Sequence, residues 1–511
     1  MPSETIRHHG FRFFFFIILS AALNVAAFPK LELSWLAFVG FVPLLLLLWP
    51  PQAGRPFLTF FLAGLLFHLG NLYWIVHVIQ HYTTLSTLLS VGVLLLLCLV
   101  LSLFWGAFGL LIGRLAVRSG FERAMLAAPF LWMILEWTRN HLTHFPWCFL
   151  GDSQYENLRL AQFTTFFGVY GLSGLIMAFN AAATISIVRR KYRYLGIVIG
   201  LILVTVLYGH YRIGQPVSGE SLRVGLIQGN IPQDEKIDYS FADDVNRKHL
   251  QLTAQLIQEH DPELIFWPEA ATLFPLRGGG EWTRQITGLA RDSSTALVVG
   301  SDSFQGREIY NTAFLVSAAG EIKSEYSKMY LVPFGEYVPF RSIFFFAGKV
   351  VHEISDFSAG KHYSLFEVND KKFGIHICFE VVFPQLTRNF CLRGASLLST
   401  ITNDAWFGDT AAPHQHFAMA VMRAIETRRY LVRAANTGIS GIVDPYGRIL
   451  HRTSLFTEAK LSGEVKWVEE QTFYTRYGDV LVYVSMLLCI AVVFQALVRK
   501  SPQPTTGAHS S

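Results

Sequence analysis

The sequence is poor in charged residues. Asp, Glu, Lys and Arg make up 15% of its 511 residues and hydrophobic residues make up 52%, so the mean hydropathy is +0.36. A soluble domain of ordinary composition has about 25% charged residues. A wholly soluble chain is therefore excluded, and we expect part of it to lie in a membrane.

Cysteine is scarce as well. The chain has five cysteines, and two of them, Cys98 and Cys489, lie in long apolar runs. Cys148, Cys378 and Cys391 lie outside those runs. An odd number with this placement does not indicate a disulfide framework.

Motifs for a bound cofactor are missing too. The chain has no glycine-rich loop that would cradle phosphate and no dinucleotide fingerprint. His414 and His416 would not share a face of a helix, and no cysteine or carboxylate completes a metal site. The net charge of +5 does not indicate nucleic acid, because the basic residues cluster beside apolar runs. We therefore expect no metal, no other cofactor and no nucleic-acid partner.

Long apolar runs are what the chain has instead. Each is close to or above the length that spans a bilayer, about 17–25 residues. We therefore expect eight transmembrane helices. The runs cover approximately residues 11–28, 34–49, 57–79, 87–113, 124–138, 161–188, 194–210 and 480–498.

Basic residues are distributed unevenly around these runs. They gather before the first run and after the second, fourth, sixth and eighth, whereas loops 29–33 and 80–86 contain only Lys30. By the positive-inside rule, both termini are expected in the cytoplasm. The expected domains are a seven-helix transmembrane domain at 1–210, an extracytoplasmic domain at 211–479, an eighth helix at 480–499 and a disordered cytoplasmic tail at 500–511.

A carboxylate, Glu136, lies just inside the expected membrane edge. Such a group usually needs a partner and often has a role. Arg139 follows three residues later and could be that partner.

Segment 211–479 alternates short apolar strands with amphipathic helices, which predicts an α/β domain with helices covering the sheet faces. Strands are expected at 221–229, 263–267, 296–300, 311–317, 321–326, 373–379, 396–402, 431–435 and 439–443. Helices are expected at 245–260, 282–291, 381–393 and 414–430.

Cys378 is expected where one of these strands ends and a helix begins. Free backbone N–H groups and the helix dipole would there favour a thiolate and could hold an oxyanion. The alternative is a buried free cysteine with a packing role.

Two further residues could serve such a nucleophile. Glu269 follows a short apolar strand, where partial burial would raise its pKa and suit it to general-base work. Lys328 is a cation among apolar residues. The alternatives are a strand-end acid and a solvated lysine at the surface.

The order of motifs along the chain resembles the nitrilase superfamily, whose members use a Glu-Lys-Cys triad on an αββα sandwich. Together with the membrane runs, it resembles the apolipoprotein N-acyltransferase family, the membrane-embedded branch. The motifs are Phe145-Pro146-Trp147, Ser153-Gln154, Gln228 to Gln233, Trp267-Pro268-Glu269, Leu331 to Glu336, Ile377 to Glu380, Asn403 to Gly408 and His414-Gln415-His416. Phe379 departs from the family pattern, which usually has Tyr after the nucleophile.

The resemblance implies a role for each residue of the triad. Glu269 would be the general base, Lys328 the oxyanion stabiliser and Cys378 the nucleophile, assisted by the backbone N–H of Phe379. Glu336 and Glu380 resemble family acids that position Lys328 and set the local charge.

The resemblance also implies a reaction and its partners. A membrane phospholipid would donate an acyl chain to Cys378 as a thioester. The acceptor would be the α-amine of the N-terminal diacylglyceryl-cysteine of an apolipoprotein. The expected location is the bacterial inner membrane, with the catalytic domain in the periplasm. The alternatives are a membrane-tethered amidase with the same triad and a non-catalytic lipid-binding scaffold or transporter.

An apolar stretch follows Glu336. Five consecutive apolar residues, Ile343 to Ala347, are unusual in an exposed loop. One hypothesis is a lid that dips into the bilayer and opens for lipid, with Phe344, Phe345 and Phe346 as its apolar residues. The alternative is packing in the core.

Overall fold

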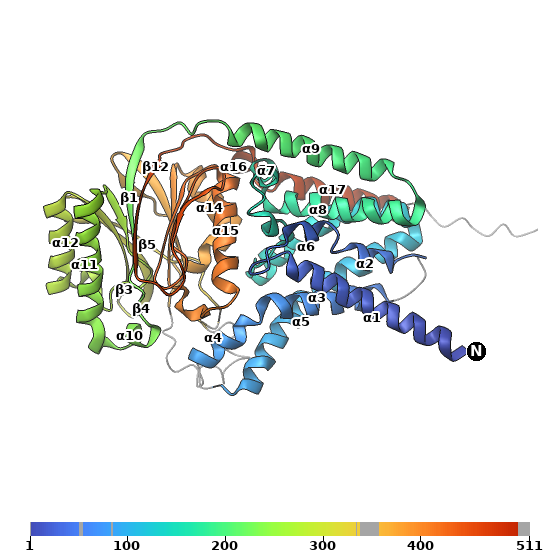
Figure 1. The fold of residues 1–511 in the computed structure, drawn as a ribbon, viewed down its shortest axis with the longest axis horizontal. Coiled ribbons are helices and arrows are strands. Elements are labelled where there is room, and N and C mark those ends of the chain that lie inside the picture. Colours follow the sequence, from blue (N-terminus) through green and yellow to red (C-terminus); the bar gives the residue numbers. More distant parts are fainter. Residues whose placement is uncertain (1, 51–54, 83–84, 334, 338–356, 499–511) are drawn as a thin grey trace, which may run out of the picture.

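The computed structural model describes the chain except for residues 1, 51–54, 83–84, 334, 338–356 and 499–511. A helical region and an α/β sandwich lie end to end along the longest axis (Figure 1). The helical region is built from the first part of the chain and from the C-terminal helix. Its helices are α1 (Pro2–Ala26), α2 (Val42–Leu46), α3 (Pro56–Leu72), α4 (Trp74–Tyr82), α5 (Thr87–Ser119), α6 (Phe121–Thr143), α7 (Leu158–Ala161), α8 (Thr164–Arg189), α9 (Arg193–Ile213) and α17 (Val480–Val498).

Three helices, α5, α8 and α9, are long and apolar enough to cross a membrane. Helices α3 and α4 qualify together as one pair that is bent by 51°. Shorter apolar helices lie at Phe13–Ala26, Ser34–Leu46 and Val480–Ile490. Within the described ranges, three or four candidate spans therefore meet this criterion, whereas the hydropathy of the sequence predicts eight.

The predicted run at 34–49 shows why an apolar run need not be one helix. It contains a 3-10 turn, Ser34–Phe38, followed by the short helix α2. Pro43 lies at the start of α2. Proline has no N–H to donate to a preceding helical turn, so it is well suited to the first turn of a helix and disfavours a longer helix that runs through it.

The sandwich consists of two six-stranded sheets. The first has the order β12-β1-β2-β3-β4-β5 and the second β11-β10-β9-β8-β7-β6. In each sheet three neighbouring strands are parallel and the outer strands are antiparallel. The strands are β1 (Ser221–Gln228), β2 (Leu264–Phe266), β3 (Ala296–Gln305), β4 (Glu308–Val316), β5 (Ile322–Ser327), β6 (Phe366–Val368), β7 (Lys371–Ile377), β8 (Leu397–Thr402), β9 (Leu431–Ala435), β10 (Gly441–Val443), β11 (Ile449–Arg452) and β12 (Ala459–Lys466).

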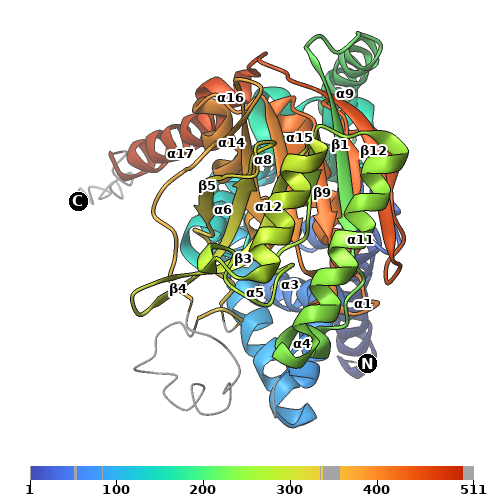
Figure 2. The same cartoon turned by 90° about the vertical axis from the view of Figure 1, so that its left-hand side faces the viewer.

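Helices cover both outer faces of the sheets, so the predicted αββα sandwich is confirmed. Helices α11 (Ala242–His260) and α12 (Glu281–Ser293) lie across the first sheet (Figure 2). Helices α14 (Pro384–Leu392) and α15 (Ala412–Thr427) lie between the second sheet and the helical region (Figure 1). Two short helices, α10 (Gln233–Ile237) and α16 (Phe473–Tyr477), and strands β6, β11 and β12 are absent from the sequence-based prediction.

Helix α15 is buried on nearly all sides, because it is enclosed by the second sheet and the helical region. Of its residues, only His414 is not buried. It carries a buried ion pair in which Arg423 Nε lies 2.9 Å from Glu426 Oε2. Buried charges of this kind need partners. Glu426 accepts the backbone N–H of Val169 in α8 at 2.8 Å, and this bond ties the sandwich to the helical region.

Helix α9 packs closely against the backbone of α7 at Gly209. A Cβ atom at Gly209 would lie 1.9 Å from the carbonyl oxygen of Arg159, so glycine is required there. We expect Gly209→Ala to lower the melting temperature in detergent, since overpacking costs about 1–3 kcal/mol.

Gly200→Ala on the same helix is the matched control. Nothing lies within 4 Å of a Cβ at Gly200, and alanine is the better helix former. Thermal unfolding of both variants tests the contact. A Gly209→Ala protein as stable as the Gly200→Ala protein would show that α7 and α9 do not pack this closely.

Candidate active site

Glu269 lies just beyond the end of β2 and is 5% exposed. Its Oε1 accepts hydrogen bonds from Asn311 Nδ2 at 2.7 Å and Lys328 Nζ at 3.1 Å. Its Oε2 accepts the backbone N–H of Asn403 at 2.8 Å. Three donors from distant parts of the chain therefore hold this carboxylate in one orientation.

Lys328 follows the last residue of β5 and is 1% exposed. Its ammonium donates to Glu269 and also to Glu336 Oε1, at 2.8 Å. Glu336 is held in turn by the N–H of Val332 at 2.8 Å and by Asn311 Nδ2 at 3.0 Å. The sequence predicted that Glu269, Lys328 and Glu336 act at one site, and the fold brings them together.

The electrostatics of this cluster keep Lys328 and Glu269 charged. Burial alone would lower the pKa of Lys328, but the charges of Glu269 and Glu336 outweigh it and raise that pKa. Burial alone would raise the pKa of Glu269, but the charge of Lys328 and the hydrogen bonds to the carboxylate lower it. The prediction that Glu269 has a raised pKa is therefore wrong, because its nearest neighbour is a cation.

Cys378 lies directly after β7, as predicted, and is 7% exposed. Its backbone adopts the left-handed region with a φ of 54°, which is uncommon for a residue with a side chain. Burial raises the pKa of its thiol, and the charge of Glu269 raises it further, while Lys328 acts in the opposite direction.

The expectation that the surroundings of Cys378 favour a thiolate is therefore wrong. The residues from Cys378 to Val382 form a 3-10 turn, and the α-helix begins only at Pro384. That helix thus begins six residues after the cysteine in the sequence, and the dipole of a helix acts mainly within its first turn. Burial beside a carboxylate then decides the protonation state, and the resting group is a thiol.

Glu380 connects the turn at Cys378 to the segment that carries Lys328. Its Oε2 accepts the N–H of Ile377 at 2.8 Å. Its Oε1 accepts the N–H of Met329 at 2.6 Å and the hydroxyl of Tyr326 at 2.8 Å. The segment around Lys328 is therefore tied to the turn at the cysteine, through a side chain before the lysine and the backbone after it. Burial raises the pKa of Glu380 to about 7.

Phe379 faces the helical region. Its ring centroid lies 6.2 Å from that of Phe145 and 6.3 Å from that of Trp147, both in the loop that follows α6. The Phe383 ring packs edge-on at 5.2 Å. The candidate site therefore lies at the junction between the sandwich and the helical region, beside aromatic rings contributed by both.

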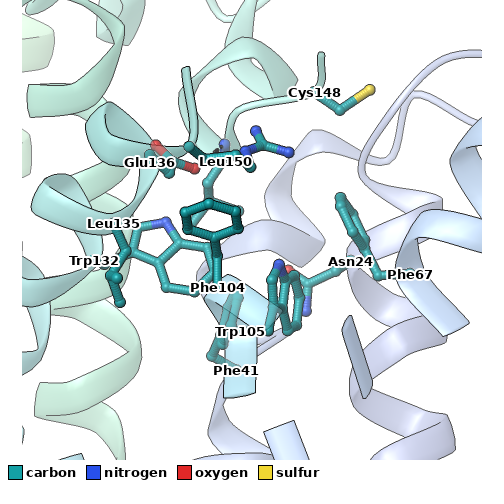
Figure 3. A pocket seen from close by; sticks show the side chains of 11 residues that line it. Asn24, Phe41, Phe67, Phe104, Trp105, Trp132, Leu135, Glu136, Cys148 and Leu150 are labelled. Atoms are coloured by element: carbon teal, nitrogen blue, oxygen red, sulfur yellow. Dashed lines mark hydrogen bonds between the residues drawn. The ribbon is translucent and has the colours of Figure 1, made fainter. Parts of the chain in front are cut away.

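Glu136 and Arg139 line a small aromatic cavity in the helical region. Figure 3 shows Glu136 above the ring of Trp132, with Phe104 and Trp105 also lining the cavity. Glu136 accepts the N–H of Leu150 at 2.8 Å. The Arg139 guanidinium lies over the Phe149 ring, at 4.8 Å. Its charge acts on Glu136, as the sequence suggested, but the two side chains, both among the described residues, form no direct ion pair.

The proposed lid residues Phe344, Phe345 and Phe346 lie outside the described residues. His414 and His416 lie on α15. Across the part of the chain that the structure describes, no cluster of three or more His, Cys, Asp or Glu side chains could hold a metal ion.

Two asparagines of the site are absent from the sequence-based prediction of function. Asn311, at the start of the expected strand, donates to Glu269 and Glu336 together. Asn403, in the motif after β8, orients Glu269 through its backbone N–H. The motif marks Asn403 as unusual, but nothing in the strand pattern distinguishes Asn311 from an ordinary strand residue.

Comparisons with known proteins cover nearly the whole chain. The carbon-nitrogen hydrolase family model matches residues 223–472, and the model of the apolipoprotein N-acyltransferase N-terminal domain matches residues 20–182. The apolipoprotein N-acyltransferase of Geobacter metallireducens is 39% identical over 501 residues, which is 95% of each chain. That of Nitrosomonas europaea is 33% identical over 482 residues, 92% of this chain and 95% of the other. Among solved structures, Saccharomyces cerevisiae Nit3, of the nitrilase superfamily, has a TM-score of 0.38 at 17% identity, covering 56% of this chain and 97% of that one.

The pKa of Glu380 generates a prediction about stability. Its value of about 7 lies above the ordinary 4.5, so between these pH values the folded state binds a proton that the unfolded state does not. This contribution to stability is fully present below about pH 4.5 and is lost as the pH rises through about 7. Glu380→Gln has no such proton to lose, so the wild type should lose stability relative to the variant over this range.

The test is the difference in melting temperature between wild type and Glu380→Gln, measured from pH 4.5 to 7.5 in one detergent. The wild type should become less stable relative to the variant as the pH rises. Taking the difference cancels the other groups that titrate. A gap that is constant with pH, or that moves in favour of the wild type as pH rises, would contradict the assignment.

Proposed function

The chain belongs to the apolipoprotein N-acyltransferase family of the nitrilase superfamily, and we propose that it transfers an acyl chain through a thioester on Cys378. Its activity is the N-acylation of lipoproteins with an acyl chain taken from a lipid. We assign the donor as a membrane phospholipid and the acceptor as the α-amine of an N-terminal diacylglyceryl-cysteine. The observation that carries the mechanism is the buried ammonium of Lys328, held between Glu269 and Glu336 beside Cys378.

The first half-reaction forms the thioester. Glu269 takes the proton of the Cys378 thiol as the sulfur attacks the ester carbonyl of the phospholipid. Lys328 and the backbone N–H of Phe379 donate to the oxyanion of the tetrahedral intermediate. The carbon–oxygen bond then breaks, the lysophospholipid oxygen takes the proton from Glu269, and the acyl chain stays on the sulfur.

The pKa directions show why attack and proton transfer should occur together. The thiol pKa is raised and the Glu269 pKa is lowered, so a free thiolate beside a protonated Glu269 is unfavourable at rest. As the oxyanion develops, it competes for the ammonium of Lys328 and weakens its hold on Glu269. The base therefore becomes stronger when the substrate reacts, which suits general-base catalysis.

The second half-reaction discharges the thioester. The α-amine of the apolipoprotein attacks the carbonyl, Glu269 takes a proton from the amine nitrogen, and the sulfur leaves and regains that proton. A thioester keeps the acyl potential of the ester, so no nucleotide is needed for transfer to an amine. The aromatic rings of Phe145, Trp147 and Phe379 support this route because they help to exclude the water that would hydrolyse the intermediate.

Glu336 and Glu380 act as positioning residues in this proposal. Glu336 holds the side chain of Lys328, and Glu380 holds the backbone beside it. Neither is assigned a proton in the reaction.

The membrane arrangement follows from the apolar runs and their charged flanks. We assign all eight apolar runs to the membrane domain, seven of them in 1–210 and the eighth in 480–499. Both termini lie in the cytoplasm, with the tail at 500–511, and the catalytic domain at 211–479 lies in the periplasm. The location is the bacterial inner membrane, where the donor lipid and the acceptor lipoprotein both reside.

Intact-mass analysis after incubation with phospholipid vesicles tests the thioester. The wild type should gain one fatty-acyl mass that hydroxylamine removes, and Cys378→Ser should gain none that is hydroxylamine-labile. A diacylated lipopeptide should then discharge the adduct into a triacylated product. Discharge by water at the same rate would instead indicate a hydrolase, and a wild type that never acquires an adduct would contradict the proposal.

Glu269→Gln and Glu336→Gln form a matched pair, because each replaces a carboxylate that accepts from Lys328. Loss of the general base should slow acylation of Cys378 by about 10²–10⁴-fold in the first variant. The second keeps the base and should lose much less. Single-turnover acylation rates compare them, and a larger loss in Glu336→Gln would mean that the two carboxylates have been assigned the wrong way round.

A further inference from the structure

The strained backbone at Cys378 requires something to hold it. A non-glycine residue in the left-handed region is costly and persists only where its surroundings over-determine it. Cys378 has a φ of 54°, and the peptide that follows it carries the N–H assigned above to the oxyanion. The groups that fix this peptide therefore matter for catalysis.

His416 makes the contact on which this inference rests. Its Nε2 lies 3.1 Å from the carbonyl oxygen of Cys378, and its side chain is fully buried. A carbonyl oxygen can only accept a hydrogen bond, so Nε2 must carry the proton. The imidazole thus holds the carbonyl of the nucleophile from the side of α15.

Buried charges keep that imidazole in place. Arg433 Nη2 lies 3.0 Å from His416 Nδ1 and 2.6 Å from Asp404 Oδ2. Asp404 Oδ1 lies 3.1 Å from the same ring nitrogen and accepts the hydroxyl of Thr402 at 2.8 Å. The side chains of His416, Asp404 and Arg433 are all fully buried. The ring is therefore held at one nitrogen by charged groups and at the other by the nucleophile.

The geometry of the peptide bond links this contact to the reaction. In a trans peptide the C=O and the following N–H point in opposite directions within one plane. When His416 draws the Cys378 carbonyl toward α15, the Phe379 N–H points away from α15. Rotation of that peptide would break the bond to His416.

We propose that His416 is a positioning residue that aims the Phe379 N–H at the oxyanion. This inference rests on the proposed thioester mechanism and adds to it the group that sets one oxyanion donor. Asp404 lies in the segment that follows β8. Its neighbour Asn403 donates its backbone N–H to Glu269, so this segment also orients the proposed base. The Asp404–His416–Arg433 cluster thus aligns nucleophile, oxyanion donor and base.

Two substitutions of similar size separate the hydrogen bond from packing. His416→Gln can place an amide N–H near the position of Nε2, whereas His416→Met has no donor. Two rates are measured on each full-length protein in detergent: acylation of Cys378 by phospholipid, and alkylation of Cys378 by iodoacetamide. Alkylation needs the sulfur in place but forms no oxyanion, so a purely structural role would affect both rates.

We expect His416→Met to acylate about tenfold or more slowly, because an oxyanion donor is worth about 10²–10³-fold and here is misaimed rather than removed. Its alkylation should stay within about threefold of wild type, and His416→Gln should recover most of the acylation. If the Met protein does not fold, His416→Asn replaces it, because its shorter amide does not reach the carbonyl.

Three results would overturn the inference: acylation at the wild-type rate without the donor, equal losses in acylation and alkylation, or no recovery in His416→Gln. Failure of the mechanism itself is seen separately, as a wild-type protein that forms no acyl adduct. If the wild type and the His416→Met variant both acylate normally, only the proposed role of His416 is contradicted and the thioester mechanism stands.

Discussion

The ammonium of Lys328, buried between two carboxylates, is the interaction on which the site depends. A buried charge is tolerated only when it is paired and its hydrogen bonds are satisfied. Lys328 meets this condition because Glu269 follows β2, Glu336 follows β5, and Asn311 from β4 bridges the two carboxylates. The first sheet therefore has to form before these groups can meet. The cost of burying three charges constrains how the strand ends are arranged.

The same cluster favours the protonated form of the Cys378 thiol at rest. A thiol buried beside Glu269 stays protonated, and a carboxylate beside Lys328 stays ionised. An enzyme that works at a lipid surface benefits from this state, since a free thiolate would react with other electrophiles. In the proposed mechanism activation is left to the substrate, whose developing oxyanion draws Lys328 away from Glu269.

Helix α15 carries the link between the chemistry and the membrane part. On one side, His416 holds the carbonyl of Cys378. On the other, Gln415 Oε1 accepts the indole N–H of Trp147 at 2.8 Å and that of Trp74 at 3.3 Å, both from the helical region. Two adjacent residues of one buried helix thus contact different parts of the molecule: His416 contacts Cys378, and Gln415 contacts the tryptophans of the helical region. Because α15 is enclosed by both parts of the molecule, it is buried even though its sequence contains Arg423 and Glu426.

The sequence by itself determined the class of the protein and the ends of the strands that carry the proposed triad. Apolar runs indicated a membrane part, strand periodicity located β1 to β5 and β7 to β10, and the motifs marked Glu269, Lys328 and Cys378 as candidates. These features are local, so they are visible in a few neighbouring residues. The tertiary structure alone decided the contacts of Asn311 and His416 and the direction of the pKa shifts at Glu269 and Cys378. Each of these depends on which distant residue lies within a few ångströms, and the field around a buried group is set by such neighbours rather than by its own segment.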